Sequence, residues 1–197
     1  MDHEKPIIYV KNVRKVYRMG DEEVVALKRI NLRIYKGEVC CIFGTSGSGK
    51  STLLNQLAGM EKPTKGQVFI RGKNISDMND MFLEELAAFR QEHMSFIFQS
   101  YNLLPSMTAV ENVAMPLMFK GMDRKRREAM AEEMLKRVGL SHRLHHYPSQ
   151  MSGGQQQRAG IARAFVSRPE VVFADEPTGN LDTKTTAEIM DMVMGFA

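Results

Sequence analysis

The stretch that decides the fold is Gly44-Thr45-Ser46-Gly47-Ser48-Gly49-Lys50-Ser51, which matches the pattern G-x-x-x-x-G-K-[ST] at every fixed position. Glycines in such a loop let backbone N–H groups converge on phosphate oxygens without clashes from Cβ atoms. Lys50 is placed to reach the β- and γ-phosphates of a nucleotide, and the Ser51 hydroxyl to ligate Mg²⁺. The residues expected to hold the phosphates are Gly44, Thr45, Ser46, Gly47, Ser48, Gly49, Lys50, Ser51 and Thr52.

The segments on either side of this phosphate loop (residues 44–51) predict strands before it and a helix after it. Alternating and continuous apolar runs predict strands over 7–16, 26–35, 38–43 and 67–71, and a helix over 50–58 that ends at Gly59. The adjacent Cys40 and Cys41 fall in the strand expected over 38–43, and we expect both to be buried. Neighbours on a strand point to opposite faces, so no disulfide between them is expected.

The rest of the chain is predicted to alternate between helices and two short buried strands. Phe82, Leu86 and Phe89 recur at helical spacing in a helix expected over 79–90. Further helices are expected over 124–138, 152–167 and 183–194, and strands over 95–98 and 171–174. Apolar strands that lead into a phosphate loop or end in acidic residues are typical of an α/β nucleotide-binding core.

The second of these strands ends in two acids, Asp175 and Glu176. A buried strand would place Asp175 beside the Mg²⁺ that bridges the phosphates. Glu176, one residue later, could polarise a water aligned for attack on the γ-phosphorus. An exposed acidic turn after an ordinary strand is the alternative interpretation.

Composition and length limit the possible classes. The chain has 197 residues, 43% of them hydrophobic and 25% charged, and a net charge of +4, which suits one globular domain with a sizeable core. No apolar run reaches the roughly 18–20 residues of a membrane-spanning helix, and Met1–Pro6 has no apolar core of a secretion signal. We therefore expect a cytoplasmic protein.

A second Gly-rich motif lies about 20 residues before the acidic strand: Met151-Ser152-Gly153-Gly154-Gln155. Ser152 is a favourable helix N-cap, and the two glycines bare the first amides of the helix, which makes a second anion-binding helix end. The motif resembles the signature sequence of ABC-type ATPases, usually written Leu-Ser-Gly-Gly-Gln, with Met151 in place of Leu.

Three further positions resemble this family in the expected order: Gln99 resembles the Q-loop glutamine, Asp182 the D-loop aspartate, and Tyr17 an aromatic that stacks on adenine. Simple packing is the alternative for Tyr17. The resemblance implies that Glu176, Gln99 and Lys50 are catalytic and that Ser51, Gln99 and Asp175 hold Mg²⁺. It also implies that Ser152, Gly153, Gly154 and Gln155 meet ATP bound by a second copy, and that Asp182 contacts this copy.

The resemblance implies an α/β fold with a P-loop NTPase (RecA-like) core, an antiparallel β subdomain and a helical subdomain that carries the signature. Within a single nucleotide-binding domain over 1–197, residues 1–90 and 160–197 would form the core and β subdomain, and about 100–158 the helical subdomain. The implied cofactors are ATP and Mg²⁺. The implied partners are a second copy in a head-to-tail dimer and a membrane permease, with no nucleic acid, because no coiled-coil insertion separates the two Gly-rich motifs.

The stretch from Phe98 to Pro105 and the run from Asp175 to Asp182 look like the ATPases of macrolide-exporter and lipoprotein-release systems. In such systems this region docks a permease helix, which places the protein peripherally on the inner face of the cell membrane. Leu103, Leu104 and Met107 would suit such a groove, and ordinary core packing is the alternative.

The family also carries a switch histidine some 25–35 residues beyond Asp182, a position that this sequence, which ends at Ala197, does not contain. The resemblance therefore implies a domain that is incomplete at its C-terminus, with slow or absent hydrolysis. A non-catalytic ATP-binding regulatory or scaffold module stays open as the alternative function.

Overall fold

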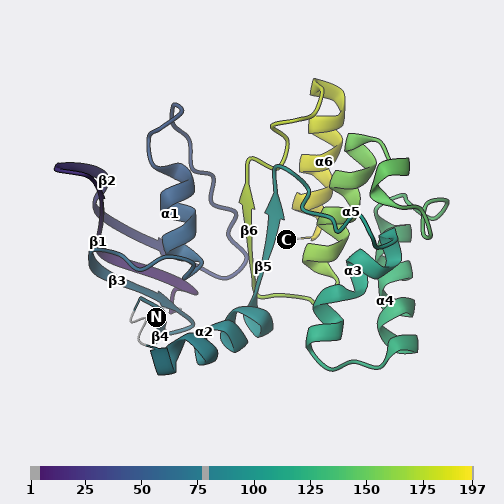
Figure 1. The fold of residues 1–197 in the computed structure, drawn as a ribbon, viewed down its shortest axis with the longest axis horizontal. Coiled ribbons are helices and arrows are strands. Elements are labelled where there is room, and N and C mark those ends of the chain that lie inside the picture. The colour runs from purple at the N-terminus through teal and green to yellow at the C-terminus, as the bar shows by residue number, and fades with distance from the viewer. Residues whose placement is uncertain (1–4, 77–79, 197) are drawn as a thin grey trace. The chain divides into compact units, whose positions relative to one another are not determined.

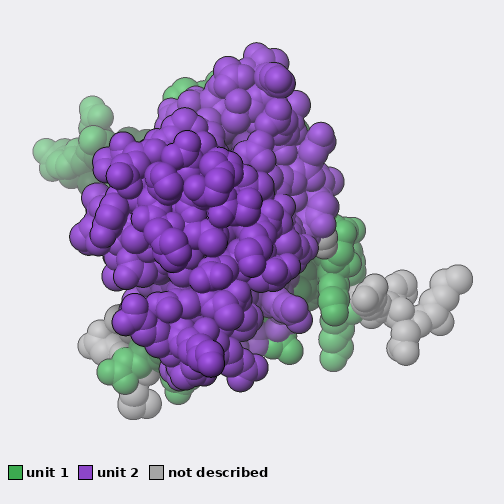
Figure 2. All heavy atoms as spheres, turned by 90° about the vertical axis from the view of Figure 1, so that its right-hand side faces the viewer, with its two compact units in different colours: residues 1–88 green, residues 89–197 purple. Residues whose placement is uncertain are grey.

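The computed structural model describes residues 5–76 and 80–196. The chain forms two compact units, residues 1–88 and 89–197, which are coloured separately in Figure 2. Asn79, the expected first residue of a helix, lies outside the described residues, and so does the side chain of Phe82. The expected division into a core with residues 1–90 and 160–197 and a helical subdomain over about 100–158 stays a prediction.

The first unit is built on an antiparallel sheet with the strand order β2-β1-β3-β4 (Figure 1). Its strands are β1 (Ile8–Met19), β2 (Glu22–Ile34), β3 (Lys65–Ile70) and β4 (Lys73–Asn74). The buried side chains Ile8, Val10, Val68 and Ile70 lie on the two paired strands β1 and β3. The strands expected over 7–16, 26–35 and 67–71 are therefore confirmed.

Helix α1 (Lys50–Leu57) follows the phosphate loop, as expected. Gly59 ends it with a left-handed φ of 62°, and a Cβ there would lie 3.3 Å from Ile75 Cδ1. The position therefore needs a residue without a side chain, for reasons of both conformation and space.

The strand expected over 38–43 is absent, and that prediction was wrong. The segment has no regular secondary structure, Val39 is 48% exposed and Phe43 89% exposed, and Cys40 and Cys41 are exposed free thiols rather than buried. A strand forms only where a neighbour completes its hydrogen-bond ladder, and β-propensity alone does not supply that neighbour. Among the described residues, no strand pairs with 38–43.

The second unit combines a parallel pair of strands with a group of helices. Helix α2 (Asp80–His93), whose residues 80–88 still belong to the first unit, leads into β5 (Met94–Phe98), which pairs with β6 (Val171–Asp175). The other helices are α3 (Ala109–Phe119), α4 (Arg124–Arg137), the short 3₁₀ helix η1 (Pro148–Gln150), α5 (Gly153–Phe165) and α6 (Thr183–Phe196). All the strands and helices expected in this part of the chain are present, with ends shifted by a few residues.

Helix α5 belongs to both apolar clusters of the second unit. Its residues Ala159 and Ala162 pack with α3 and α4 around Val113 and Leu135. Its residues Ile161 and Ala164 pack on Ile97 of β5 and Ile189 of α6. Figure 1 shows α5 between α3 and α6 accordingly. No helix in the described part of the chain is long and apolar enough to span a bilayer.

Helix α3 was not predicted, although its start carries a readable signal. Thr108 and Glu111 form a capping box: Thr108 Oγ1 accepts a hydrogen bond from Glu111 N–H, and Thr108 N–H donates to Glu111 Oε2 at 2.8 Å. The backbone hydrogen bond from Thr108, then its side-chain bond, lowers the pKa of Glu111. The pattern T-x-x-E before an apolar run predicts this helix start.

Asn112, on α3, holds the loop that precedes the helix. Its side chain is fully buried, accepts a hydrogen bond from Leu104 N–H at 2.7 Å, and donates to the carbonyls of Leu104, Met107 and Thr108. One amide thus pairs four backbone groups. Two of them, Leu104 O and Thr108 O, also accept backbone hydrogen bonds, from Met107 N–H and from Asn112 N–H.

We expect Asn112→Leu to lower the free energy of unfolding by about 2–4 kcal/mol, because it removes the side-chain partner of Leu104 N–H and of Met107 O. Urea unfolding followed by circular dichroism measures the change. Arg126→Ala, on the exposed surface of α4, is the control and should change stability by less than about 0.5 kcal/mol. Equal unfolding midpoints for the two variants would contradict this role of Asn112.

Candidate active site

The phosphate loop of the first unit has the geometry of an anion cradle. Gly47 and Gly49 adopt left-handed φ values of 78° and 91°, and a Cβ at Gly49 would lie 2.6 Å from Ala26 O. A Cβ at Gly44 would lie 2.5 Å from Ser48 Oγ, inside the loop. Gly47 and Gly49 need glycine for their conformation, and Gly44 leaves room for the Ser48 side chain, so the residues present suit the close approach of phosphate oxygens to the backbone.

Lys50 turns back over this loop. Its Nζ donates to Gly44 O and to Thr45 O, both at 3.0 Å. The two carbonyls hold the Lys50 ammonium at the loop. A bound phosphate can replace these carbonyls as the hydrogen-bond acceptor of the ammonium. Ser51 and Thr52 follow at the start of α1, so the positive end of the helix dipole adds to the charge of Lys50.

Tyr17, the predicted adenine contact, lies in a polar network of the same unit. Its hydroxyl donates to Glu61 Oε2 at 2.8 Å, and Lys15 Nζ lies 5.1 Å from its ring centroid. Burial and the hydrogen bond with Glu61 raise the pKa of Tyr17, while a hydrogen bond with Thr52 lowers it. The ring therefore lies beside the phosphate-loop helix, and its contact with adenine stays a prediction.

In the second unit, strands β5 and β6 bring Gln99 and the two acids to one edge. The parallel register pairs Phe98 with Asp175, so Gln99 and Glu176 leave the sheet side by side. The carboxyl ends of parallel strands are where ligands bind in α/β sheets. The sequence predictions for Gln99, Asp175 and Glu176 thus meet in one place.

The glutamate turn (residues 176–180) fixes these groups further. Glu176 has a left-handed φ of 43°, a conformation that costs a non-glycine residue about 1–2 kcal/mol. Gly179 N–H donates to Glu176 O at 3.0 Å, and Asn180 Nδ2 donates to Gln99 O at 3.1 Å. A Cβ at Gly179 would lie 2.6 Å from Gln99 Nε2, so the glutamine side chain rests directly on this glycine.

The signature motif begins α5, with Ser152 as its N-cap, as predicted, and with Gly153 and Gly154 half-buried. Ser152 and Gln155 form a capping box, with Ser152 N–H donating to Gln155 Oε1 at 3.0 Å. Gly153 lies against a tyrosine hydroxyl, because a Cβ there would be 2.9 Å from Tyr101 Oη. Gly154 lies against Thr185, whose Cγ2 would be 3.1 Å from such a Cβ.

Arg163 is a site-supporting residue that the sequence analysis missed. Its guanidinium donates to Asn102 O at 2.6 Å and to Tyr101 O at 2.8 Å, and both of those residues have left-handed φ values. Burial lowers the pKa of Arg163. An arginine in the last turn of a helix carries no sequence signal for this role, and the two carbonyls it binds lie about 60 residues earlier.

Asp182, the predicted D-loop aspartate, is exposed and caps α6. Its carboxylate accepts from Thr185 Oγ1 at 2.6 Å and from Thr185 N–H at 3.0 Å, and these bonds lower its pKa. Its contact with a second copy stays a prediction.

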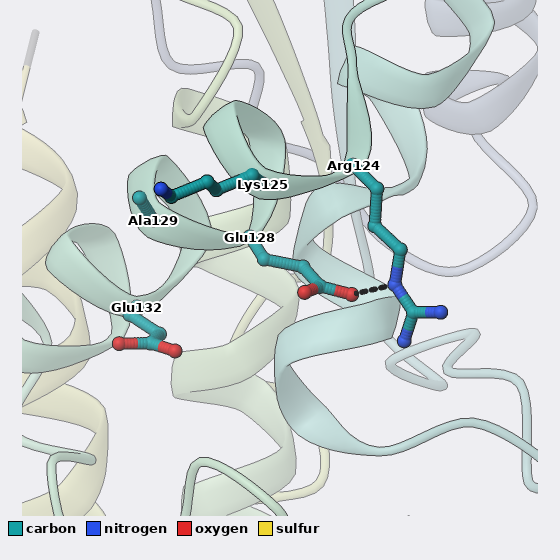
Figure 3. A pocket seen from close by; sticks show the side chains of 5 residues that line it. All are labelled: Arg124, Lys125, Glu128, Ala129 and Glu132. Atoms are coloured by element: carbon teal, nitrogen blue, oxygen red, sulfur yellow. Dashed lines mark hydrogen bonds and ion pairs between the residues drawn. The ribbon is translucent and has the colours of Figure 1, made fainter.

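A pocket of about 440 Å³ lies elsewhere, on the surface of α4, and does not involve these residues (Figure 3). It is lined by Arg124, Lys125, Glu128, Ala129 and Glu132. Arg124 Nε pairs with Glu128 Oε1 at 2.7 Å, one turn along the helix. Exposed pairs of this spacing contribute a few tenths of a kcal/mol, so the pocket is a solvated helix face rather than a reaction site.

Comparisons with known proteins identify the class of this site. The sequence profile of the family described as "ABC transporter" matches residues 27–179. The chain belongs to this ABC transporter family, as an ATP-binding subunit and ABC ATPase.

Two relatives and one solved structure place it more closely. The chain is 44% identical over 194 residues to the lipoprotein-releasing system ATP-binding protein LolD of Alcanivorax borkumensis, covering 98% of this chain and 84% of the relative. It is 46% identical over 189 residues to the macrolide export ATP-binding/permease protein MacB of Pasteurella multocida, covering 96% of this chain and 29% of that longer protein. The dimeric ATP-binding cassette MJ0796 in a post-hydrolysis state with ADP and Pi superposes with a TM-score of 0.85 at 45% identity, covering 94% and 81% of the two chains. The resemblance to the macrolide-exporter and lipoprotein-release branch is therefore confirmed.

We expect Gly179→Ala to lower ATP turnover about ten- to a hundredfold, because the new methyl group displaces the Gln99 amide by roughly an ångström. Steady-state phosphate release measures the effect. Gly195→Ala is the matched control, since a Cβ at Gly195 meets nothing within 4 Å. Turnover of Gly179→Ala equal to that of this control would show that the position of Gln99 does not matter.

Proposed function

We propose that this protein converts ATP hydrolysis into movement of a membrane permease, with two copies closing head to tail on ATP. The observation that carries the proposal is the β5–β6 register, which delivers Gln99, Asp175 and Glu176 to one edge of the sheet. The dimeric cassette to which the chain is similar, and the fusion of a permease to the ATP-binding part in its MacB relative, support the assembly.

In this mechanism each residue has a defined task. Lys50 and the backbone amides of the phosphate loop neutralise and orient the phosphates, and Ser51, Gln99 and Asp175 would hold Mg²⁺, which supplies charge neutralisation at the β- and γ-oxygens when bound. Glu176 accepts a hydrogen bond from the attacking water and aligns it. The oxygen ligands fit Mg²⁺, which prefers carboxylate, hydroxyl and amide oxygens.

We assign the start of α5 to the ATP of the second copy. Ser152, Gly153, Gly154 and Gln155 form the N-terminal end of α5, whose partial positive charge suits a γ-phosphate. Binding of this kind makes ATP part of the dimer interface, so hydrolysis weakens the dimer.

We place the permease contact on α3 and α4. A pocket of about 200 Å³ is lined there by Met107, Met115 and Met118, with Glu111, Arg124, Arg127 and Glu128 among the charged residues around them. Methionines adapt to an inserted apolar side chain, and mixed charges suit the ends of a short helix. Of the residues expected in this groove, Met107 lines it, whereas Leu103 packs against the α3–α5 core and Leu104 is 42% exposed. The protein then sits peripherally at the cytoplasmic face of the membrane.

We expect Glu176→Gln to lower ATP turnover at least about a hundredfold while ATP stays bound, because the neutral amide no longer polarises the water. Lys50→Ala should lose ATP binding, because the loop then lacks its mobile cation. Phosphate release and the binding of a fluorescent ATP analogue measure the two properties. Glu133→Gln, an exposed acid on α4, is the control. Unchanged turnover in Glu176→Gln would remove Glu176 from the reaction and favour a non-catalytic ATP-binding module.

We expect Met118→Glu to weaken binding to the detergent-solubilised cognate permease by about tenfold or more, because a charge then faces an apolar insert. Met118 is 40% exposed, and Met194→Glu on α6, where Met194 is 51% exposed, is the matched control. Binding is measured by surface plasmon resonance on the immobilised permease. Equal affinities of the two variants would place the contact elsewhere.

A further inference from the structure

Gln157, in the second turn of α5, reaches from the signature helix to the glutamate turn. Its side chain is fully buried, and its Nε2 donates to the carbonyl oxygen of Pro177, the residue directly after Glu176. The bond joins two segments 20 residues apart in sequence, within one compact unit.

The side-chain amide of Gln157 lies in an apolar environment that satisfies only part of its hydrogen-bonding capacity. Its Oε1 is buried and has no hydrogen-bond partner among the described residues. Around it on the same helix lie the buried apolar residues Ala159, Ile161 and Ala162. A buried polar atom without a partner costs free energy that an apolar side chain of the same size would avoid. The bond to Pro177 is therefore what the amide contributes at this position.

The peptide that Gln157 holds is one that the chain does not adopt easily. Glu176 has a left-handed φ of 43° and precedes a proline, and residues before proline favour extended conformations. Within the turn, Gly179 N–H donates to Glu176 O, the carbonyl oxygen of the peptide bond between Glu176 and Pro177. Gln157 donates to Pro177 O, the carbonyl oxygen of the next peptide bond. The two hydrogen bonds together keep Glu176 in its unusual conformation.

We propose that Gln157 is a positioning residue for Glu176, which fixes the peptide after the catalytic carboxylate to the signature helix. Without this bond the Glu176 backbone relaxes toward an extended conformation, and its carboxylate leaves the line of the attacking water. The inference rests on the proposed role of Glu176 and adds a physical link between the signature motif and that residue.

The first test compares Gln157→Leu with Gln156→Leu. Both glutamines lie on α5 and both donate from Nε2 to a backbone carbonyl, but Gln156 binds Met151 O at 3.1 Å, away from the glutamate turn. We expect Gln157→Leu to lower kcat about tenfold with an unchanged KM for ATP, and Gln156→Leu to stay within about twofold of the wild type. A kcat of Gln157→Leu within twofold of the wild type, or an equal loss in both variants, overturns the proposal.

The second test uses Gln157→Glu and a pH profile, and it decides the matter where Gln157→Leu does not fold. Burial raises the pKa of the introduced carboxyl, so it becomes neutral as the pH falls. Its protonated O–H can donate to Pro177 O, whereas the ionised form has only acceptors and repels that carbonyl. We expect the ratio of its turnover to that of the wild type to rise as the pH falls from mildly alkaline to mildly acidic. A ratio that stays flat or falls is evidence against the bond and overturns the proposal.

Glu176→Gln, measured alongside, separates this inference from the proposed function. If Glu176→Gln abolishes turnover but the Gln157 variants behave as the wild type, the positioning role alone is wrong. If Glu176→Gln turns over ATP normally, the assignment of Glu176 itself fails, and the positioning role fails with it.

Discussion

The parallel pairing of β5 with β6 is the constraint on which the active-site geometry of the second unit depends. Phe98 lies opposite Asp175, so Gln99 and Glu176 emerge from the same edge of the sheet. A slip of one residue would turn every side chain of β6 to the opposite face and move both acids away from Gln99. Two almost fully buried side chains hold this register: Ile97 packs on α5 and α6, and Phe173 stacks on Phe96 with ring centroids 5.3 Å apart.

Helix α5 connects that edge of the sheet to the signature motif and to the loop that follows β5. Its start carries the signature motif, its second turn reaches Pro177 through Gln157, and its last turn binds Tyr101 and Asn102 through Arg163. Buried polar groups of this kind are costly unless paired, so each of them defines where a neighbouring loop must lie. The apolar faces of α5 supply the stability that these polar contacts do not, because they complete the cores on both sides.

Much of this arrangement could be predicted from the sequence, because its signals are local. Glycines at fixed spacing before Lys50, a serine before two glycines, and an apolar strand ending in Asp175 and Glu176 each act through nearby backbone. The long-range contacts could not be predicted. Gln157 and Arg163 look like ordinary helical residues, and only the fold brings Pro177, Tyr101 and Asn102 to them. Helix α3 was missed although Thr108 and Glu111 form a readable capping box.

The segment over 38–43 shows the opposite error, in which a strong local signal did not produce the expected element. Val39, Ile42 and Phe43 have the side chains of a buried strand, yet each is substantially exposed. Burial of a strand requires backbone partners on at least one side, and these six residues have none among the described strands. An apolar composition therefore indicates that a segment would be stabilised by burial in a sheet. Whether it forms a strand depends on a neighbouring strand that can pair with its backbone. By the same reasoning β5 and β6, equally short and apolar, form strands because each supplies the backbone hydrogen-bond partners of the other.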